Sequence, residues 1–129
     1  MRVLVDTQVL LWAVAEPRKL TAPVRVRLEA PENAILFSAA SIWELAIKVR
    51  IGRLVLPIEL EELADAARRM GFEELPVSAA HAAGVSRLPD YHRDPFDRML
   101  VAQAIHEPAR FLTADRALGR YSNLVEIIA

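Results

Sequence analysis

The sequence predicts an α/β fold in which a mainly parallel sheet lies between two layers of helices. Short apolar runs alternate along the chain with longer segments that carry helix-capping and helix-stopping residues. This alternation is typical of βαβ units, whose parallel strands are covered by helices on both faces. The chain has 129 residues, a length that suits one domain with a sizeable core. We therefore expect a single three-layer α/β/α domain over residues 1–129.

Each expected element follows from a local signal. Strands are expected at short β-branched and apolar runs such as Val3-Leu4-Val5, because these suit a sheet buried on both faces. Helices are expected after capping residues such as Ser38 and Ser78, and before stops such as Pro17 and Gly52. In chain order the expected elements are strand 3–5, helix 8–15, helix 21–30, strand 34–37, helix 38–50, helix 59–70, strand 72–77, helix 78–85, helix 94–106, strand 111–113, a helical turn at 115–119 and strand 124–128.

The composition excludes several classes of function. The chain has no cysteine, which excludes disulfides, thiolate zinc sites and a cysteine nucleophile. Its three histidines lack zinc-type spacing. The net charge is −1, so binding of nucleic acid would need a local basic rim around an acidic centre. No apolar run is long enough to cross a bilayer, and Asp6 interrupts any signal-peptide core. We expect a cytoplasmic protein with no membrane partner.

Four acids are expected to meet at one edge of the sheet. Asp6 directly follows the first strand, and Asp115 comes two residues after Thr113 in a later strand. Glu44 lies on the helix after the second strand, and Asp97 lies in the first turn of the helix that leads into strand 111–113. Ligands of open parallel sheets bind beyond the carboxyl ends of the strands. The four carboxylates therefore have access to a common site.

Each of these acids also has a purely structural interpretation. Asp6 and Asp115 can cap helices, and Glu44 and Asp97 each stand at the fourth position of a capping-box pattern. Two considerations favour a site. A helix that begins at Ser38 places Glu44 in its second turn, beyond the reach of a cap. Moreover, gathered carboxylates repel one another unless a cation neutralises them. Ligation by oxygen alone points to Mg²⁺ or Mn²⁺.

At these same residues the chain resembles the PIN-domain family, and more narrowly its VapC-type toxins. The likeness covers nearly the whole chain, in one PIN domain over residues 1–129. It is specific because four segments occur in the family's order. These segments are LVDTQVLLW (4–12), SAASIWELAIK (38–48), HRDPFDRMLVAQA (92–104) and LTAD (112–115). Gln8 departs from the pattern, since the family often has histidine there, which leaves that position's role in substrate contact open.

The resemblance implies a ribonuclease that hydrolyses RNA phosphodiesters with Mg²⁺, Mn²⁺ being the alternative. Its catalytic and metal-binding residues fall on Asp6, Glu44, Asp97 and Asp115. Asp6 and Asp97 are the first choice as direct ligands, while Glu44 and Asp115 hold metal-bound waters, complete a second site or orient the nucleophile. The implied partners are the RNA substrate, a cognate antitoxin and a second copy of the chain in a homodimer. The alternative is a non-catalytic PIN scaffold that binds RNA or protein.

Several neighbouring side chains have two interpretations. Asp94 either shares the site or caps its helix, and Pro95 at the first helical position favours the cap. The hydroxyls of Thr7, Ser38 and Thr113 either support the acids or cap strand ends. Lys48, Arg93 and Arg98 either bind phosphate or pair with nearby acids, Lys48 with Glu44 and Arg98 with Asp94. Trp12 and Trp43 are expected in the core or at an interface.

Overall fold

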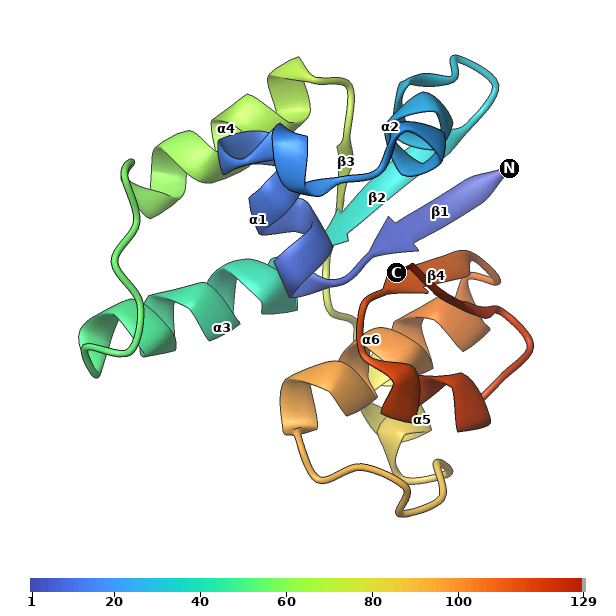
Figure 1. Ribbon diagram of the computed structural model, residues 1–129. Helices are drawn as coiled ribbons and strands as arrows, with labels where there is room; N and C mark the ends of the chain where they lie inside the picture. The colour runs from blue at the N-terminus through green and yellow to red at the C-terminus, as the bar shows by residue number, and fades with distance from the viewer. Residues whose placement is uncertain (129) are drawn as a thin grey trace.

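A parallel sheet with the strand order β3-β2-β1-β4-β5 forms the centre of the computed structural model, which describes residues 1–128 (Figure 1). All four neighbouring pairs are parallel. The strands are β1 (Arg2–Val5), β2 (Ala34–Ser38), β3 (Glu73–Leu75), β4 (Arg110–Thr113) and β5 (Val125–Ile127). The predicted three-layer α/β/α class with a mainly parallel sheet is confirmed.

Helices occupy both faces of this sheet. They are α1 (Thr7–Ala15), α2 (Ala22–Glu29), α3 (Ala39–Arg50), α4 (Leu60–Arg69), α5 (Ala79–Val85) and α6 (Pro95–His106). The described residues also form two 3₁₀ helices, η1 (Pro17–Lys19) and η2 (Arg116–Arg120). None of the helices in the described part of the chain is long and apolar enough to span a membrane.

The core consists of two layers, one on each face of the sheet. Because side chains alternate along a strand, Val3 and Val5 of β1 pack with apolar residues of α1, α2 and α4 on one face. Leu4 points to the opposite face, where it packs with Leu100 and Val101 of α6. Helix α5 lies against α6 on that second side (Figure 1). The sheet is thus buried on both faces, as its continuous apolar strands predict.

The strand order places a topological switch point between β1 and β4. From β1 the chain first builds β2 and β3 on one side, and then returns to add β4 and β5 on the other. The carboxyl ends of β1 and β4 are neighbours, since Val5 pairs with Leu112. Ligands of open α/β sheets bind in the crevice at such a point. Asp6 and Asp115, which follow these two strands, stand on either side of it.

The differences from the predicted elements are local. The strand expected at 72–77 pairs only over Glu73–Leu75. The Phe72 N–H donates to the Ala67 carbonyl at the end of α4, and Pro76 has no N–H to offer to the sheet. Pro17 ends the first helix as expected, but it also begins η1, a short helix that was not predicted. Proline suits this first position because its missing N–H is not needed there.

Candidate active site

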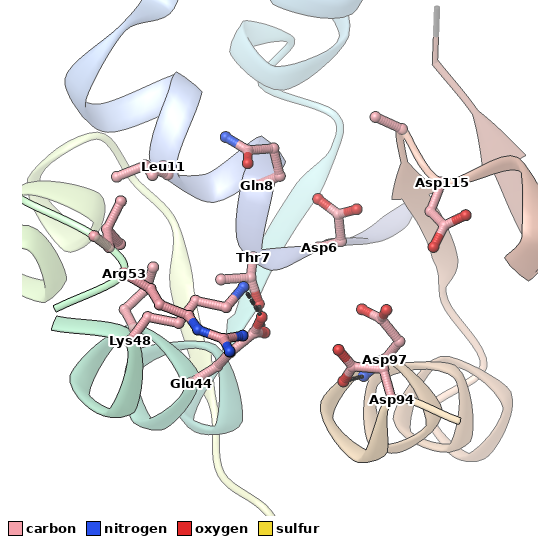
Figure 2. A pocket seen from close by; sticks show the side chains of 13 residues that line it. Asp6, Thr7, Gln8, Leu11, Glu44, Lys48, Arg53, Asp94, Asp97 and Asp115 are labelled. Carbon is pink, nitrogen blue, oxygen red and sulfur yellow. Dashed lines mark hydrogen bonds and ion pairs between the residues drawn. The ribbon is translucent and has the colours of Figure 1, made fainter. Parts of the chain in front are cut away.

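Five carboxylates line one cavity of about 590 Å³ at the carboxyl ends of β1 and β4. Four of them are the acids singled out from the sequence, namely Asp6, Glu44, Asp97 and Asp115, and the fifth is Asp94. Figure 2 shows Asp6, Asp97 and Asp115 directed toward a common space from β1, α6 and the segment after β4. The fold therefore brings together all four residues that the sequence predicted to meet.

Asp6 combines a structural role with a place in the cavity. Its Oδ1 accepts a hydrogen bond of 2.7 Å from the Val9 N–H, which makes it the N-cap of α1. Burial raises the pKa of Asp6 above its usual value, and the charge of Glu44 adds to this rise. Hydrogen bonds from the Thr113 hydroxyl and from backbone N–H groups oppose it. The expected cap is present, and the same carboxyl group lines the site.

Glu44 is buried and held by two neighbours. The Thr7 hydroxyl donates to its Oε1 over 2.8 Å, and Lys48 Nζ lies 2.6 Å from its Oε2. The expected ion pair with Lys48 is confirmed, with its acid end inside the protein. The capping-box interpretation of Glu44 is wrong, because Ser38 caps α3 by accepting from the Ala40 N–H. Glu44 thus enters the cavity with a cation already beside it.

Asp97 is a half-buried cavity acid with a strongly raised pKa. Burial raises its pKa to about 7, and the charges of Asp94 and Glu44 contribute next, while His92 lowers it. Asp94 Oδ1 accepts hydrogen bonds from the N–H groups of Phe96 at 2.8 Å and of Asp97 at 3.1 Å. The expected cap by Asp94 is confirmed, and its charge also acts on Asp97.

Asp115 likewise caps a helix with one carboxylate oxygen, while its other oxygen contacts a neighbouring side chain at the cavity. Its Oδ1 accepts from the Ala117 N–H at 3.0 Å, at the start of η2. Its Oδ2 lies 2.9 Å from Nε2 of His92. The Thr113 hydroxyl accepts from the backbone N–H of Asp115 at 3.0 Å. Thr113 therefore acts on two cavity acids, because its hydroxyl also lowers the pKa of Asp6.

The expected pairing of Arg98 with Asp94 is wrong. The Arg98 guanidinium instead donates to the Pro89 carbonyl over 2.8 Å and to the Tyr121 hydroxyl over 3.1 Å, and it contacts other carbonyls of the same loop. Its acidic neighbour within ion-pair range is Asp90. Arg98 is thereby engaged in holding the loop before α6. Arg93 is exposed and does not line the cavity.

Two residues near the cavity received no role from the sequence. His92 contacts Asp115, which lies 23 residues further along the chain, so no local spacing indicates the pair. Arg53 lines the cavity on the side of Lys48 and Glu44 (Figure 2). A signal for Arg53 was present, since it directly follows the helix-stopping Gly52 at the edge where the acids gather. Together with Lys48, it forms a local basic rim beside the acidic cavity. A chain with a net charge of −1 would need such a rim to bind nucleic acid.

The donor set fits a hard divalent cation. Within residues 1–128, Asp6 has no ion-pair partner, and Asp97 has only His92 at 3.5 Å. Both carboxyl groups have raised pKa values because burial and like charges disfavour their ionised form. A bound cation reverses this balance. Carboxylate oxygens are the ligands that Mg²⁺ and Mn²⁺ prefer.

One tryptophan lies against the core and the other on the surface. Trp12 is partly buried and packs against the core layer of α1, α2 and α4. Trp43 is not a core residue, since 64% of its surface is exposed, and its ring meets Phe96 edge-on with centroids 5.1 Å apart. Its place at an interface stays a prediction.

Comparison with known proteins agrees with this geometry. A model of the PIN domain matches residues 3–124. The chain is 34% identical over 122 residues to Ribonuclease VapC22 of Mycobacterium tuberculosis (strain ATCC 25618 / H37Rv), an alignment that covers 90% of this chain and 88% of that protein. It is 42% identical over 72 residues to Ribonuclease VapC16 of the same organism, over 55% of this chain and 46% of that protein.

Solved structures share the fold. A chain in the crystal structure of VapBC2 from Rickettsia felis, bound to a DNA fragment from its promoter, superposes with a TM-score of 0.73 at 19% identity over 100% of both chains. A chain of FitAcB from Neisseria gonorrhoeae gives a TM-score of 0.55 at 19% identity, over 90% of this chain and 89% of that one. With the family match over residues 3–124 and the 34% identity to a VapC ribonuclease, this chain belongs to the PIN-domain family, among its VapC-type proteins.

Proposed function

We propose that this protein is an Mg²⁺-dependent ribonuclease that hydrolyses RNA phosphodiesters and acts as the toxin of a toxin–antitoxin pair. The observation that carries the proposal is the cavity in which Asp6 and Asp97, both with raised pKa values, lie without a lysine or arginine partner among residues 1–128. The relatives that share 34% and 42% identity are named ribonucleases, which supports the nuclease activity.

The cavity residues divide the work according to their partners. Asp6 and Asp97 would hold the cation directly, because theirs are the carboxylates whose charge is least compensated. Glu44 and Asp115 would hold water molecules around it or complete a second site, and Thr7 and Lys48 keep Glu44 in place. When bound, the cation supplies an activated water at neutral pH and neutralises charge on the phosphodiester.

The basic rim would receive the substrate. Lys48 and Arg53 lie at one side of the acidic cavity (Figure 2), where their charges would attract a phosphate of the RNA next to the scissile bond. Gln8 lines the same cavity and can exchange hydrogen bonds with a nucleotide. The position of this rim beside the acidic centre would allow a strand of RNA to pass over the cavity.

Two protein partners belong to the same proposal. A cognate antitoxin would cover the toxin, by analogy with the VapBC2 pair from Rickettsia felis, one chain of which shares this fold. A second copy of the chain would form a homodimer. Co-purification with the product of the neighbouring small gene tests the first partner, and light scattering of the isolated chain tests the second. These assemblies are independent of whether the acids cleave RNA.

A cleavage assay with matched variants tests the enzymatic proposal. We expect purified full-length protein, freed of antitoxin, to cut a panel of structured RNAs with Mg²⁺ or Mn²⁺ and to stop in EDTA. Asp6→Asn and Asp97→Asn keep the side-chain shape but remove charge that the cation requires, so each should abolish cleavage. Glu62→Gln changes an exposed acid of α4 outside the cavity and should leave cleavage unchanged.

Loss of cleavage in the two acid variants also excludes a contaminating nuclease, because all variants are prepared identically. If Asp6→Asn or Asp97→Asn cleaves as fast as the wild type, that residue is not an essential ligand. If the wild type and a double variant that carries both Asp6→Asn and Asp97→Asn behave alike on every RNA tested, the ribonuclease proposal fails and the non-catalytic PIN scaffold replaces it.

A further inference from the structure

His92 lies between two of the cavity acids, on the loop that joins α5 to α6. Its Nε2 is 2.9 Å from Oδ2 of Asp115 and 3.5 Å from Oδ2 of Asp97. These three side chains offer ligand atoms within 4.8 Å of one another, a spacing compatible with a shared metal ion. The imidazole therefore either binds a cation itself or acts on the carboxylates that do.

The other ring nitrogen decides between these roles. Nδ1 of His92 accepts a hydrogen bond of 3.1 Å from the backbone N–H of Asp94. A nitrogen that accepts has its lone pair free and carries no proton, so the proton of the neutral ring is on Nε2. Nε2–H consequently donates to Asp115 and has no lone pair for a metal. This arrangement makes His92 a hydrogen-bond donor to the carboxylates.

The ring is held in this orientation by the surrounding loop. The backbone N–H of His92 donates to the Tyr121 hydroxyl over 2.9 Å, and Arg98 donates to the same hydroxyl over 3.1 Å. Arg98 also binds the Pro89 carbonyl of the loop. These contacts connect the segment before α6 with the end of η2. His92 is thus fixed at both its backbone and its side chain.

Asp115 depends on such support more than the other acids. It follows β4 on an irregular segment, and 42% of its side chain is exposed. The cap to the Ala117 N–H holds Oδ1, but rotation about that contact would still move Oδ2. The hydrogen bond from His92 restrains this second oxygen. It places Oδ2 on the side of Asp97, because Nε2 lies near both carboxylates.

We propose that His92 is a positioning residue, which donates from Nε2 to Asp115 and so holds that carboxylate beside Asp97 ready to receive a cation. This role rests on the proposed metal site and deepens it. Groups that orient metal ligands through hydrogen bonds affect metal affinity without touching the metal. His92 belongs to this class, although its two neighbouring carboxylates would allow a ligand.

Two substitutions separate the hydrogen bond from the mere presence of a side chain. His92→Gln keeps an N–H donor at about the distance of Nε2, whereas His92→Leu fills similar space without a donor. In calorimetric titration with Mn²⁺ we expect His92→Leu to bind about 10–100-fold more weakly than the wild type. His92→Gln should recover most of this loss. Arg93→Leu is the control, because it changes an exposed residue of the same loop that does not line the cavity, and it should bind Mn²⁺ like the wild type.

The tautomer gives a readout that needs neither metal nor activity. Long-range ¹H–¹⁵N correlation spectra of the metal-free wild type should show His92 protonated on Nε2 and unprotonated on Nδ1. A His92 ring protonated on Nδ1 alone would overturn the proposal. So would His92→Leu with wild-type affinity for Mn²⁺, or His92→Gln that loses as much affinity as His92→Leu.

These outcomes are distinct from failure of the ribonuclease proposal. If the wild type cleaves RNA but the wild type, His92→Leu and His92→Gln all bind Mn²⁺ equally well, the positioning role fails and the ribonuclease proposal is unaffected. If the wild type cleaves no RNA, but His92→Leu weakens Mn²⁺ binding and His92→Gln restores it, the positioning role stands while the ribonuclease fails.

Discussion

At the scale of single residues, the cavity acids differ in how their charges are balanced. Glu44 has Lys48 and Thr7 as partners, and Asp115 has His92. Asp97 instead is buried near the charges of Asp94, Glu44 and Asp6, which together raise its pKa to about 7 although His92 lowers it. A group whose ionised form is disfavoured in the folded protein destabilises the fold when it ionises. The metal-free site therefore has a cost that depends on pH.

We expect the metal-free protein to lose stability between about pH 4 and pH 7 through Asp97. Its raised pKa means that the folded state binds this proton more tightly than the unfolded chain does. The stabilisation is complete below the unfolded value of 3.8 and is lost as the pH rises through about 7. Urea unfolding in EDTA across this range measures the slope of the free energy of unfolding.

Asp97→Asn is the variant that assigns this slope, because asparagine cannot ionise. It should remove the part of the dependence that Asp97 causes between about pH 5 and pH 7, and leave the part that the raised pKa of Asp6 causes. The metal-free variant should also be more stable at about pH 8 than the wild type. Glu107 and Glu126 do not confuse the comparison, since their pKa values are lowered by His81 and Arg27 and they titrate below this range. An equal slope in wild type and variant would contradict the assignment.

Asp94 allows its two roles to be separated by substitution. Asp94→Ser keeps a good N-cap for the Phe96 and Asp97 N–H groups but removes the charge, whereas Asp94→Ala removes both. We expect Asp94→Ala to lower the free energy of unfolding by about 1 kcal/mol relative to Asp94→Ser. Both should lower the pKa of Asp97, read by ¹³C NMR of its carboxyl group, because the charge of Asp94 raises it.

Two results with Asp94→Ser and Asp94→Ala would contradict these expectations. A pKa of Asp97 that stays at its wild-type value in Asp94→Ser would show that the charge of Asp94 does not act on Asp97. Equal stability of the serine and alanine variants would show that the cap is unimportant to α6.

The sequence predicted that four acids meet in one cavity, as they do. It wrongly treated capping a helix and lining the site as alternative roles for one carboxylate. Asp6, Asp94 and Asp115 each cap a helix through Oδ1 and line the cavity as well. A carboxylate has two oxygens, so the same spacing serves both roles. The contact of His92 with Asp115 was not predictable, because it joins two irregular loops for which sequence periodicity gives no register.

At the scale of elements, the end of α3 determines where the basic rim begins. The Arg53 N–H donates to the Lys48 carbonyl, and the Gly52 N–H donates to the Val49 carbonyl. This is the Schellman pattern, in which the glycine takes a positive φ, here 77°. The turn reverses the chain directly after α3, so that Arg53 lines the cavity beside Lys48. The stop predicted at Gly52 is confirmed.

Two glycine substitutions should act in opposite directions. Gly52→Ala should lower the free energy of unfolding by about 1 kcal/mol, because an L-residue is disfavoured at positive φ, although a Cβ there would contact nothing within 4 Å. Gly84→Ala should raise it by about 0.5–1 kcal/mol. Gly84 lies inside α5, where an added Cβ would make an ordinary 3.7 Å contact with Ala102. Urea unfolding of the two variants checks both signs.

A destabilised Gly84→Ala would show that α5 and α6 lack room for the added methyl group. A neutral Gly52→Ala would show that the turn after α3 relaxes to another conformation. In that case the rim position of Arg53 would not depend on the glycine.

The same scale shows where sequence patterns stop being informative. All five strands and all six α-helices of the described residues were predicted within about two residues at their ends, and the largest difference is at the strand around β3. That strand was predicted too long because Phe72 and Pro76 have no N–H available to the sheet. Where a strand begins and ends thus depends on hydrogen bonds to neighbouring elements, and these cannot be inferred from the residues of the strand alone.

At the scale of the whole molecule, the parallel sheet explains why distant acids meet. Parallel strands place their carboxyl ends at one edge, and this rule alone predicted that Asp6 and Asp115 share it. The order of the strands was not predictable, because it depends on pairing between segments far apart in the sequence. Asp6 and Asp115 are close because β1 and β4 are neighbours, and α3 and α6 complete the cavity.

Mg²⁺ should stabilise the folded protein as a whole. A cation that binds only the folded state adds about 2.7 kcal/mol at a free concentration about 100 times its dissociation constant. We therefore expect the Tm of metal-free protein to rise with added Mg²⁺ or Mn²⁺. The double variant Asp6→Asn, Asp97→Asn should show no such rise, whereas Glu62→Gln should respond like the wild type. A Tm of verified metal-free wild type that ignores both ions would contradict a preformed site.

The central claim is that the carboxylate cavity is a divalent-cation site, and anomalous diffraction from crystals grown with Mn²⁺ tests it most directly. The anomalous signal locates manganese independently of any assay of activity. We predict a peak inside the cavity, within ligand distance of Asp6 and Asp97, and its loss in the double variant that replaces both acids with asparagine. A cavity without a peak at saturating Mn²⁺, or a peak that persists unchanged in the double variant, would contradict the claim.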